Sequence, residues 1–237
     1  MSSWDGPAEA TPAILIHGTL SWAARAFERQ RPLARARRVL LPDRRGFGAS
    51  PDLRDADVTS DYVVDAEDVL GLLAGGAHLV GHSYGATVAT VAAAARPDQV
   101  RSLTLIEPCA HGLASDDPVV AGAVQDARRF MSEARRRPAE DYLDQVYGDR
   151  PRPEPASWLL RAAHTALHER PCWLAELTTA PLAAARRVRR CAGRSRGRDA
   201  TRRPDSAAGW GICVSLGRGL LRVVLLLWRI RVAVGRK

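Results

Sequence analysis

The sequence is short of lysine and of long apolar runs. Lys237 is the only lysine among 35 basic residues. The longest uninterrupted apolar run near the C-terminus, Val223 to Trp228, has six residues. A helix that crosses a bilayer needs roughly 20 such residues, so no membrane-spanning helix is expected.

Cysteine is also scarce and widely spaced. The first residues lack a basic stretch followed by an apolar one, so no secretory signal peptide is visible. The four cysteines form no C-x-x-C pair and no paired spacing of the kind that binds metal, so neither a metal nor a cofactor is expected. Reduced thiols in a cytoplasmic protein are the expectation from these absences. The cysteines are Cys109, Cys172, Cys191 and Cys213.

The net charge of +9 comes entirely from the last 52 residues. From Arg186 to Lys237 there are 15 basic and 2 acidic residues, whereas residues 1–185 hold 20 basic and 24 acidic residues. The mildly acidic body gives no reason to expect binding of nucleic acid. The arginine-rich tail could bind nucleic acid or an anionic membrane by releasing counterions, and this is the least favoured function.

Strand and helix patterns alternate from residue 13 to residue 108. Short apolar runs predict buried strands at residues 13–16, 39–41, 77–80 and 103–106. Amphipathic or alanine-rich stretches predict helices at residues 22–31, 62–73 and 86–95. This alternation is typical of a parallel α/β sheet. Residues 1–12 are polar and are expected to form a disordered lead.

After residue 108 the strand pattern stops and three helices are predicted, at residues 119–137, 139–147 and 156–168. We therefore predict a core at residues 1–108, a helical lid at 109–185 and an arginine-rich tail at 186–237. The apolar residues of the lid helices predict an apolar pocket. These residues are Val119, Val124, Phe130, Trp158 and Leu159.

The stretch Gly81-His82-Ser83-Tyr84-Gly85 carries the strongest functional signal. It joins a predicted strand to an alanine-rich helix, the context of a tight turn that lifts a serine hydroxyl above the end of a parallel strand. The two glycines suit such a turn because a side chain at either position would collide with the neighbouring strand or helix. A glycine-flanked serine in an ordinary turn is the less favoured interpretation.

Four stretches together resemble the α/β-hydrolase superfamily, in the branch whose nucleophile is serine. They are the turn at residues 15–19 (LIHGT), the loop at 43–50 (DRRGFGAS), the stretch at 81–85 and the strand at 103–108 (LTLIEP). The resemblance covers residues 13 to about 180. It implies a parallel-sheet α/β fold with a helical lid, incomplete here at the C-terminal strands. The implied activity is the hydrolysis of small ester or related carbonyl substrates.

The resemblance also implies the roles of individual residues. Ser83 would be the nucleophile, forming an acyl-enzyme that water hydrolyses. The backbone N–H groups of Tyr84 and Thr19 would bind the oxyanion. Glu107, at the end of the last predicted strand, is a candidate for the acid. The substrate would be a small molecule with an apolar acyl part, and the loop at residues 43–50 would be structural.

The base of the resembled family, a histidine late in the chain, is not found. The two histidines next to the motifs, His17 and His82, match family positions that are structural. Little or no turnover is therefore expected, and a non-catalytic binding protein on the same fold is the alternative. We interpret the arginine-rich tail as a change of reading frame near Ala184. The six histidines are His17, His78, His82, His111, His164 and His168.

Overall fold

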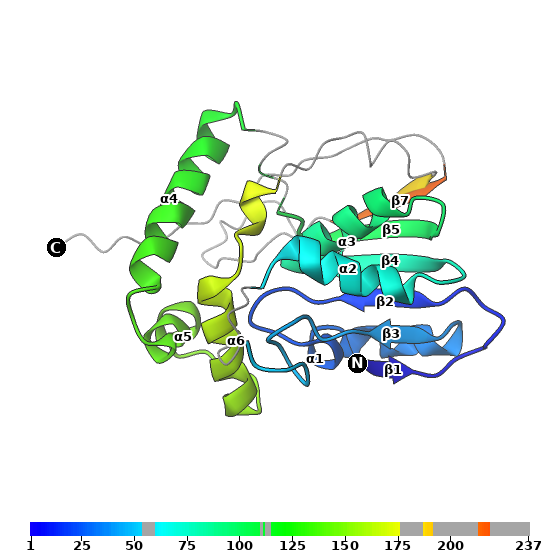
Figure 1. The fold of residues 1–237 in the computed structure, drawn as a ribbon, viewed down its shortest axis with the longest axis horizontal. Helices are drawn as coiled ribbons and strands as arrows, with labels where there is room; N and C mark the ends of the chain where they lie inside the picture. Colours follow the sequence, from blue (N-terminus) through cyan, green and yellow to red (C-terminus); the bar gives the residue numbers. More distant parts are fainter. Residues whose placement is uncertain (54–59, 110, 112–114, 176–186, 192–212, 219–237) are drawn as a thin grey trace, which may run out of the picture.

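A mostly parallel sheet lies at the centre of the protein (Figure 1). The computed structural model describes residues 1–53, 60–109, 111, 115–175, 187–191 and 213–218, with side chains up to residue 175. The strand order is β1-β3-β2-β4-β5-β7-β6. The strands are β1 (Ser2–Trp4), β2 (Ala13–Ile16), β3 (Val39–Leu41), β4 (Ala77–His82), β5 (Val100–Ile106), β6 (Arg187–Cys191) and β7 (Cys213–Arg218).

The four central strands, β3, β2, β4 and β5, are parallel and lie where the apolar runs predicted strands. All four residues of β2 are buried. Ile14 and Ile16 pack into the core on one face of the sheet, whereas Ala13 and Leu15 pack into the core on the other. A strand covered on both faces requires a continuous apolar run, and this is why the sequence pattern identified these strands.

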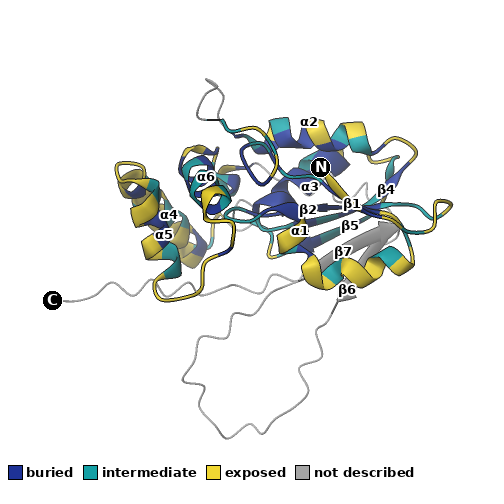
Figure 2. Ribbon diagram, turned by 90° about the horizontal axis from the view of Figure 1, so that it is seen from below, coloured by how far each residue is buried: buried dark blue, intermediate teal, exposed yellow. Residues whose placement is uncertain are grey.

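Helices cover both faces of the sheet. Helices α2 (Tyr62–Leu72) and α3 (Tyr84–Ala95) pack on one face, and α1 (Ala23–Ala26) packs on the other (Figure 2). The carboxylate of Asp61 caps α2 by accepting a hydrogen bond from the N–H of Val63 at 2.8 Å. Gly75 and Gly76, with φ of 84° and 93°, follow the end of α2. This sheet with its flanking helices confirms the predicted α/β class.

Two predictions for the N-terminal part are wrong. Residues 1–12 are not simply a disordered lead, because β1 pairs antiparallel with β3 and Trp4 is buried against the core. The helix predicted at residues 22–31 is split at Phe27 into α1 and the 3-10 helix η1 (Glu28–Arg35). Pro32 lies inside η1 rather than after it. The buried ring of Phe27 occupies the core at the break, a tertiary contact that local propensity does not reveal.

The sheet also continues beyond β5. We predicted no strand after residue 185, yet β7 pairs antiparallel with β5, and β6 pairs antiparallel with β7. These pairings give hydrogen-bond partners to backbone groups that an edge strand would leave unpaired. Ala184, the predicted site of the frame change, lies outside the described residues, as does most of the arginine-rich tail.

Three helices stand beyond one end of the sheet (Figure 1). They are α4 (Pro118–Ala134), α5 (Ala139–Tyr147) and α6 (Ala156–His168), and the short 3-10 helix η3 (Cys172–Leu174) follows them. All three lie where helices were predicted, and they share a separate apolar core that includes Leu143, Leu159 and Leu167. Within the described ranges, no helix combines the length and apolar character needed to cross a membrane.

Candidate active site

Ser83 occupies a strained turn between β4 and α3. Its φ of 52° and ψ of −119° are unusual for a residue that has a side chain. The N–H of Ser83 donates to the carbonyl of Ile106 at 2.9 Å, and the carbonyl of Ser83 accepts from Ala86 at 2.9 Å. Such backbone strain costs on the order of 1–3 kcal/mol and persists only where the surroundings fix the conformation.

Glycines allow the turn after β2 to pack directly against this serine. A Cβ atom on Gly85 would lie 2.5 Å from the carbonyl oxygen of His17, and one on Gly18 would lie 2.9 Å from the Cβ of Ser83. Gly81 is equally crowded, because its Cβ would lie 2.5 Å from the Cα of Ala86. The fold therefore places the turn that contains Thr19 beside Ser83 and the first residue of α3, Tyr84.

His17 holds this turn and has no free ring nitrogen. Its Nε2 accepts a hydrogen bond from the N–H of Arg44 at 2.9 Å, so Nδ1 carries the proton and donates to the carbonyl of Gly18 at 2.7 Å. Burial, together with the charge of Arg44, lowers the pKa of His17 to about 3. The neutral ring is a structural support, as the sequence suggested.

His82 pairs with Glu107 at the ends of neighbouring strands. The Nε2 atom of His82 lies 3.4 Å from Oε2 of Glu107, and the two side chains are 37% and 54% exposed. The Nδ1 atom of His82 lies 3.2 Å from the position that a Cβ on Gly18 would take. Ser83 and the candidate acid Glu107 thus lie at the same end of the sheet, with His82 between the acid and the turn.

Three of the remaining histidines lie on β4 and α6. His78 is at the opposite end of β4, with its Nδ1 atom 2.7 Å from the hydroxyl of Ser102. His164 and His168 stack on each other on α6 with ring centroids 4.6 Å apart. His111 is half-buried, and burial lowers its pKa. Within the described residues, no group of three or more His, Cys, Asp or Glu side chains could hold a metal ion.

A buried ionic cluster, which the sequence analysis missed, joins the lid to the turn after β2. The guanidinium of Arg44 lies 3.0 Å from the carboxylate of Asp65 and 3.0 Å from that of Glu169. The hydroxyl of Thr19 donates to the second oxygen of Glu169 at 2.6 Å. The guanidinium also lies over the ring of Tyr84, 4.0 Å from its centroid. One buried arginine thus connects the turn, α2, α3 and the segment after α6.

The cluster contains two carboxylates and one guanidinium, so full ionisation would leave one buried negative charge without a partner. Burial raises the pKa of Asp65. Burial also raises the pKa of Glu169 to about 7, from an ordinary value of 4.5, although Arg44 and Thr19 act in the opposite direction. Glu169 therefore binds a proton in the folded chain at pH values where the unfolded chain has lost it.

This proton makes stability depend on pH. A carboxyl group with a raised folded pKa contributes its full stability below about pH 4.5 and loses that contribution as the pH rises through about 7. We expect the free energy of unfolding to fall by up to about 3 kcal/mol more in the wild type than in Glu169→Gln between pH 5 and pH 8. Urea unfolding of both proteins at each pH measures this difference. Equal pH dependence in the two proteins would show that Glu169 does not titrate in this range.

The apolar lid residues, from which we predicted an apolar pocket, have other contacts. Trp158 packs edge-on against Trp22 with ring centroids 5.5 Å apart. Leu159 is buried in the core of the lid itself, and Phe130 packs against that core. Val119 is 65% exposed. Leu159 and Phe130 thus pack within the lid, and Trp158 attaches the lid to the residue that precedes α1.

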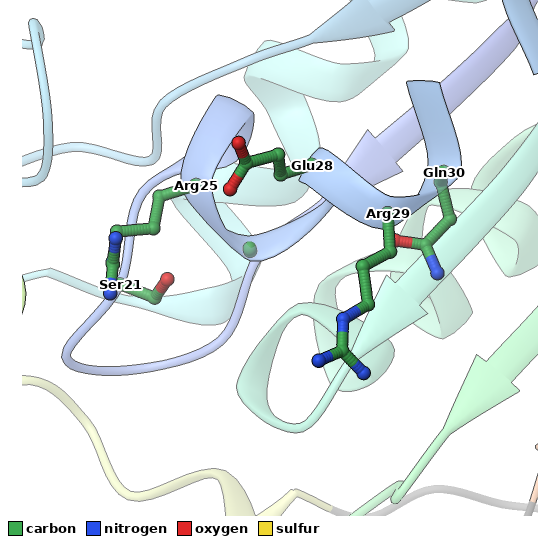
Figure 3. Close-up of a pocket in the computed structure, with 6 residues that line it drawn as sticks. Ser21, Arg25, Glu28, Arg29 and Gln30 are labelled. Carbon is green, nitrogen blue, oxygen red and sulfur yellow. The ribbon is translucent and has the colours of Figure 1, made fainter. Parts of the chain in front are cut away.

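A surface hollow lies beside α1. It has a volume of about 360 Å³ and is formed by α1, the residues before it and the start of η1 (Figure 3). Its lining is polar and includes none of the predicted site residues. The lining residues are Ser21, Arg25, Ala26, Glu28, Arg29 and Gln30.

Comparisons with known proteins agree with this geometry. Residues 13–228 match the model of the alpha/beta hydrolase family. The 2-hydroxymuconate semialdehyde hydrolase of Pseudomonas sp. (strain CF600) is 37% identical over 103 residues, which are 40% of this chain and 35% of that protein. The match therefore spans well under two thirds of that relative.

Solved structures resemble the chain as well. A probable hydrolytic enzyme from Pseudomonas aeruginosa PAO1 has a TM-score of 0.50 and 22% sequence identity, over 76% of this chain and 63% of that one. A meta-cleavage product hydrolase from Pseudomonas fluorescens IP01 has a TM-score of 0.38 and 24% identity, over 43% of this chain and 38% of that one. At 22% identity, the likeness to the first structure establishes a shared fold only.

Proposed function

Because the chain belongs to the alpha/beta hydrolase family, we propose that it is a serine hydrolase in which Ser83 attacks small ester or related carbonyl substrates. The positive φ of Ser83 between β4 and α3 carries this proposal. Backbone strain at a nucleophilic side chain is typical of functional sites. A turn without a function has no need of such strain and would adopt a relaxed conformation. The relative from strain CF600 is named for hydrolysis of a small molecule, which supports the substrate class.

The proposed chemistry uses groups that meet at the end of β4. The Oγ atom of Ser83 attacks the carbonyl carbon, and the backbone N–H groups of Tyr84 and Thr19 stabilise the negative oxygen. The intermediate then expels the leaving group, which takes up the proton lost by the serine, and the acyl-enzyme that remains is hydrolysed by water. The close contact of Gly18 with Ser83 supports the assignment of Thr19, since it brings the turn next to the serine. Glu107 is proposed as the acid. The proposed substrate has an apolar acyl part. The proposed location of the protein is the cytoplasm.

We further propose that turnover by this chain is low. Both ring nitrogens of His17 are occupied, and no histidine follows His168 in the sequence. A serine without a general base loses about two to four orders of magnitude in rate. The alternative function, a non-catalytic binding protein on the same fold, is favoured by the same lack of a late histidine. The two differ in whether Ser83 reacts once a base is supplied.

Added imidazole can supply that base. We expect a fluorophosphonate probe to label Ser83 slowly. Imidazole at high concentration should accelerate the labelling by about tenfold, which is less than the rate gain from a general base held in the protein. The amount of adduct on the peptide that contains Ser83 is measured by mass spectrometry. Any reaction of imidazole with the probe in solution is therefore not counted as labelling.

The control is Ser83→Ala, which should show no adduct on the peptide with or without imidazole. No acceleration of Ser83 labelling by imidazole would favour the binding protein over the hydrolase. Fast labelling without imidazole would instead contradict the proposed low turnover, because it would require a base within the chain.

A further inference from the structure

The segment that follows α6 contacts the side chains of both residues whose N–H groups are proposed to bind the oxyanion. The hydroxyl of Thr19 donates to Oε1 of Glu169 at 2.6 Å. The hydroxyl of Tyr84 donates to the carbonyl of the next residue, Arg170, at 2.9 Å. Two consecutive residues of the lid thus hold side chains from two separate parts of the core, the turn after β2 and the start of α3.

The turn that contains Thr19 is strained where it meets the lid. Leu20 has a φ of 56°, in the left-handed region that a residue with a bulky side chain rarely adopts. Its side chain packs against the apolar core of the lid, which includes Leu159 and Leu167. Backbone strain of this kind persists only where the surroundings fix the conformation. The lid therefore contacts the turn at two consecutive residues, through the hydrogen bond of Thr19 and the apolar contact of Leu20.

Glu169 is itself fixed by the ionic cluster. The side chain is buried, and both terminal nitrogens of the Arg44 guanidinium donate to its Oε2 atom, at 3.2 and 3.0 Å. One oxygen of the carboxyl group is thus held by the core, and the other accepts from Thr19. A carboxyl group held at one oxygen by a planar guanidinium presents its other oxygen in a defined direction.

We propose that Glu169 is a positioning residue for the hydrolysis and that it acts through the hydroxyl of Thr19. The oxyanion donor of Thr19 is its backbone N–H, so its direction is set by the conformation of the turn. Such a donor must lie within about 0.2 Å of the best hydrogen-bond distance, and a displacement of about 1 Å can lower a rate by about a hundredfold. This inference rests on the proposed function, because it takes Thr19 as an oxyanion donor.

The test compares two changes of Thr19 that differ in the hydroxyl. Thr19→Val keeps the shape of the side chain but cannot donate to Glu169, whereas Thr19→Ser keeps the hydroxyl. With imidazole present, we expect Thr19→Val to slow the fluorophosphonate labelling of Ser83 by about tenfold or more, and Thr19→Ser to remain within about twofold of the wild type. The loss should appear in the maximal rate of labelling, and the probe concentration that gives half of that rate should not change.

A double-mutant cycle assigns the effect to Glu169. In Glu169→Met the guanidinium of Arg44 keeps one carboxylate partner, Asp65, so the buried charges still balance. Thr19→Val should have little further effect in this background, because the hydroxyl has already lost its acceptor. A full tenfold loss on top of Glu169→Met would overturn the inference, since Thr19 would then act without Glu169.

Thr165→Val is the control for a merely structural effect. The hydroxyl of Thr165, on α6, donates to the carbonyl of Gly46 at 3.1 Å, so this change also removes a buried contact between the lid and the core. It should lower stability in urea without slowing the labelling of Ser83. Equal slowing by Thr165→Val and Thr19→Val would overturn the inference, because the labelling would then follow only the attachment of the lid.

The mobility of the turn separates this inference from the proposed function. By NMR relaxation, the order parameter of the N–H of residue 19 should be about 0.85 in the wild type and in Thr19→Ser, and below about 0.6 in Thr19→Val. An unchanged order parameter, or labelling of Thr19→Val at the wild-type rate, would overturn the inference alone. A wild type that is not labelled even with imidazole would contradict the proposed function itself, and the order parameter would still show whether Glu169 holds the turn.

Discussion

Replacing Arg44 with methionine is expected to lower the free energy of unfolding by about 3–5 kcal/mol. Methionine has a similar length but no charge, so Asp65 and Glu169 would remain buried without their cation. The variant would also lose the contact between the guanidinium and the ring of Tyr84. Urea unfolding measures the loss. It should be larger at pH 8 than at pH 5, because protonation of Glu169 relieves the uncompensated charge at the lower pH.

The neighbouring arginine provides a matched control. Arg45 pairs with Asp68 through two hydrogen bonds, of 2.7 and 2.8 Å, but the two side chains are 42% and 50% exposed. Arg45→Met should therefore change stability by less than about 1 kcal/mol. A variant that also carries Asp65→Asn and Glu169→Gln should recover part of the loss from Arg44→Met, since neutral groups replace the unpaired charges. Equal effects of Arg44→Met and Arg45→Met would show that the buried cluster has no special role.

The sequence predicted the parts of the fold that depend on local patterns. Continuous apolar runs identified the four parallel strands, because strands covered on both faces need such runs. Asp61 is of a residue type that is favoured at the start of a helix, and its carboxylate accepts from the N–H of Val63 at the start of α2. In contrast, β1 depends on one buried side chain, Trp4, in an otherwise polar segment. No periodicity marks such a strand, since tertiary contacts determine it.

The candidate site was predictable only where residues are adjacent in the sequence. The motif around Ser83 holds the serine, Tyr84 and two glycines in five consecutive positions, so their proximity follows from one turn. The ionic cluster instead joins Arg44 to Glu169, 125 residues apart. The loop at residues 43–50 was expected to be structural, but nothing in the sequence indicated which side chains Arg44 would pair with.

Gly85→Ala is expected to cost about 3 kcal/mol or more, because a Cβ atom there would overlap backbone atoms that cannot move aside. It would lie 2.5 Å from the carbonyl oxygen of His17 and also against that of Ile16. To make room, α3 would have to move away from β2. That movement would separate the turn that contains Thr19 from Ser83, so the reaction of the serine with fluorophosphonate should fall together with stability.

Gly122→Ala is the matched control, since Gly122 also lies within a helix, α4, but a Cβ atom there would meet nothing within 4 Å. Alanine is favoured over glycine in a helix by about 1 kcal/mol, so this variant should be as stable as the wild type or more stable. The opposite signs expected for the two changes separate helix propensity from packing. If Gly85→Ala were as stable as Gly122→Ala by urea unfolding, α3 could not be packed directly against the turn, and the proposed position of Thr19 beside Ser83 would have to be abandoned.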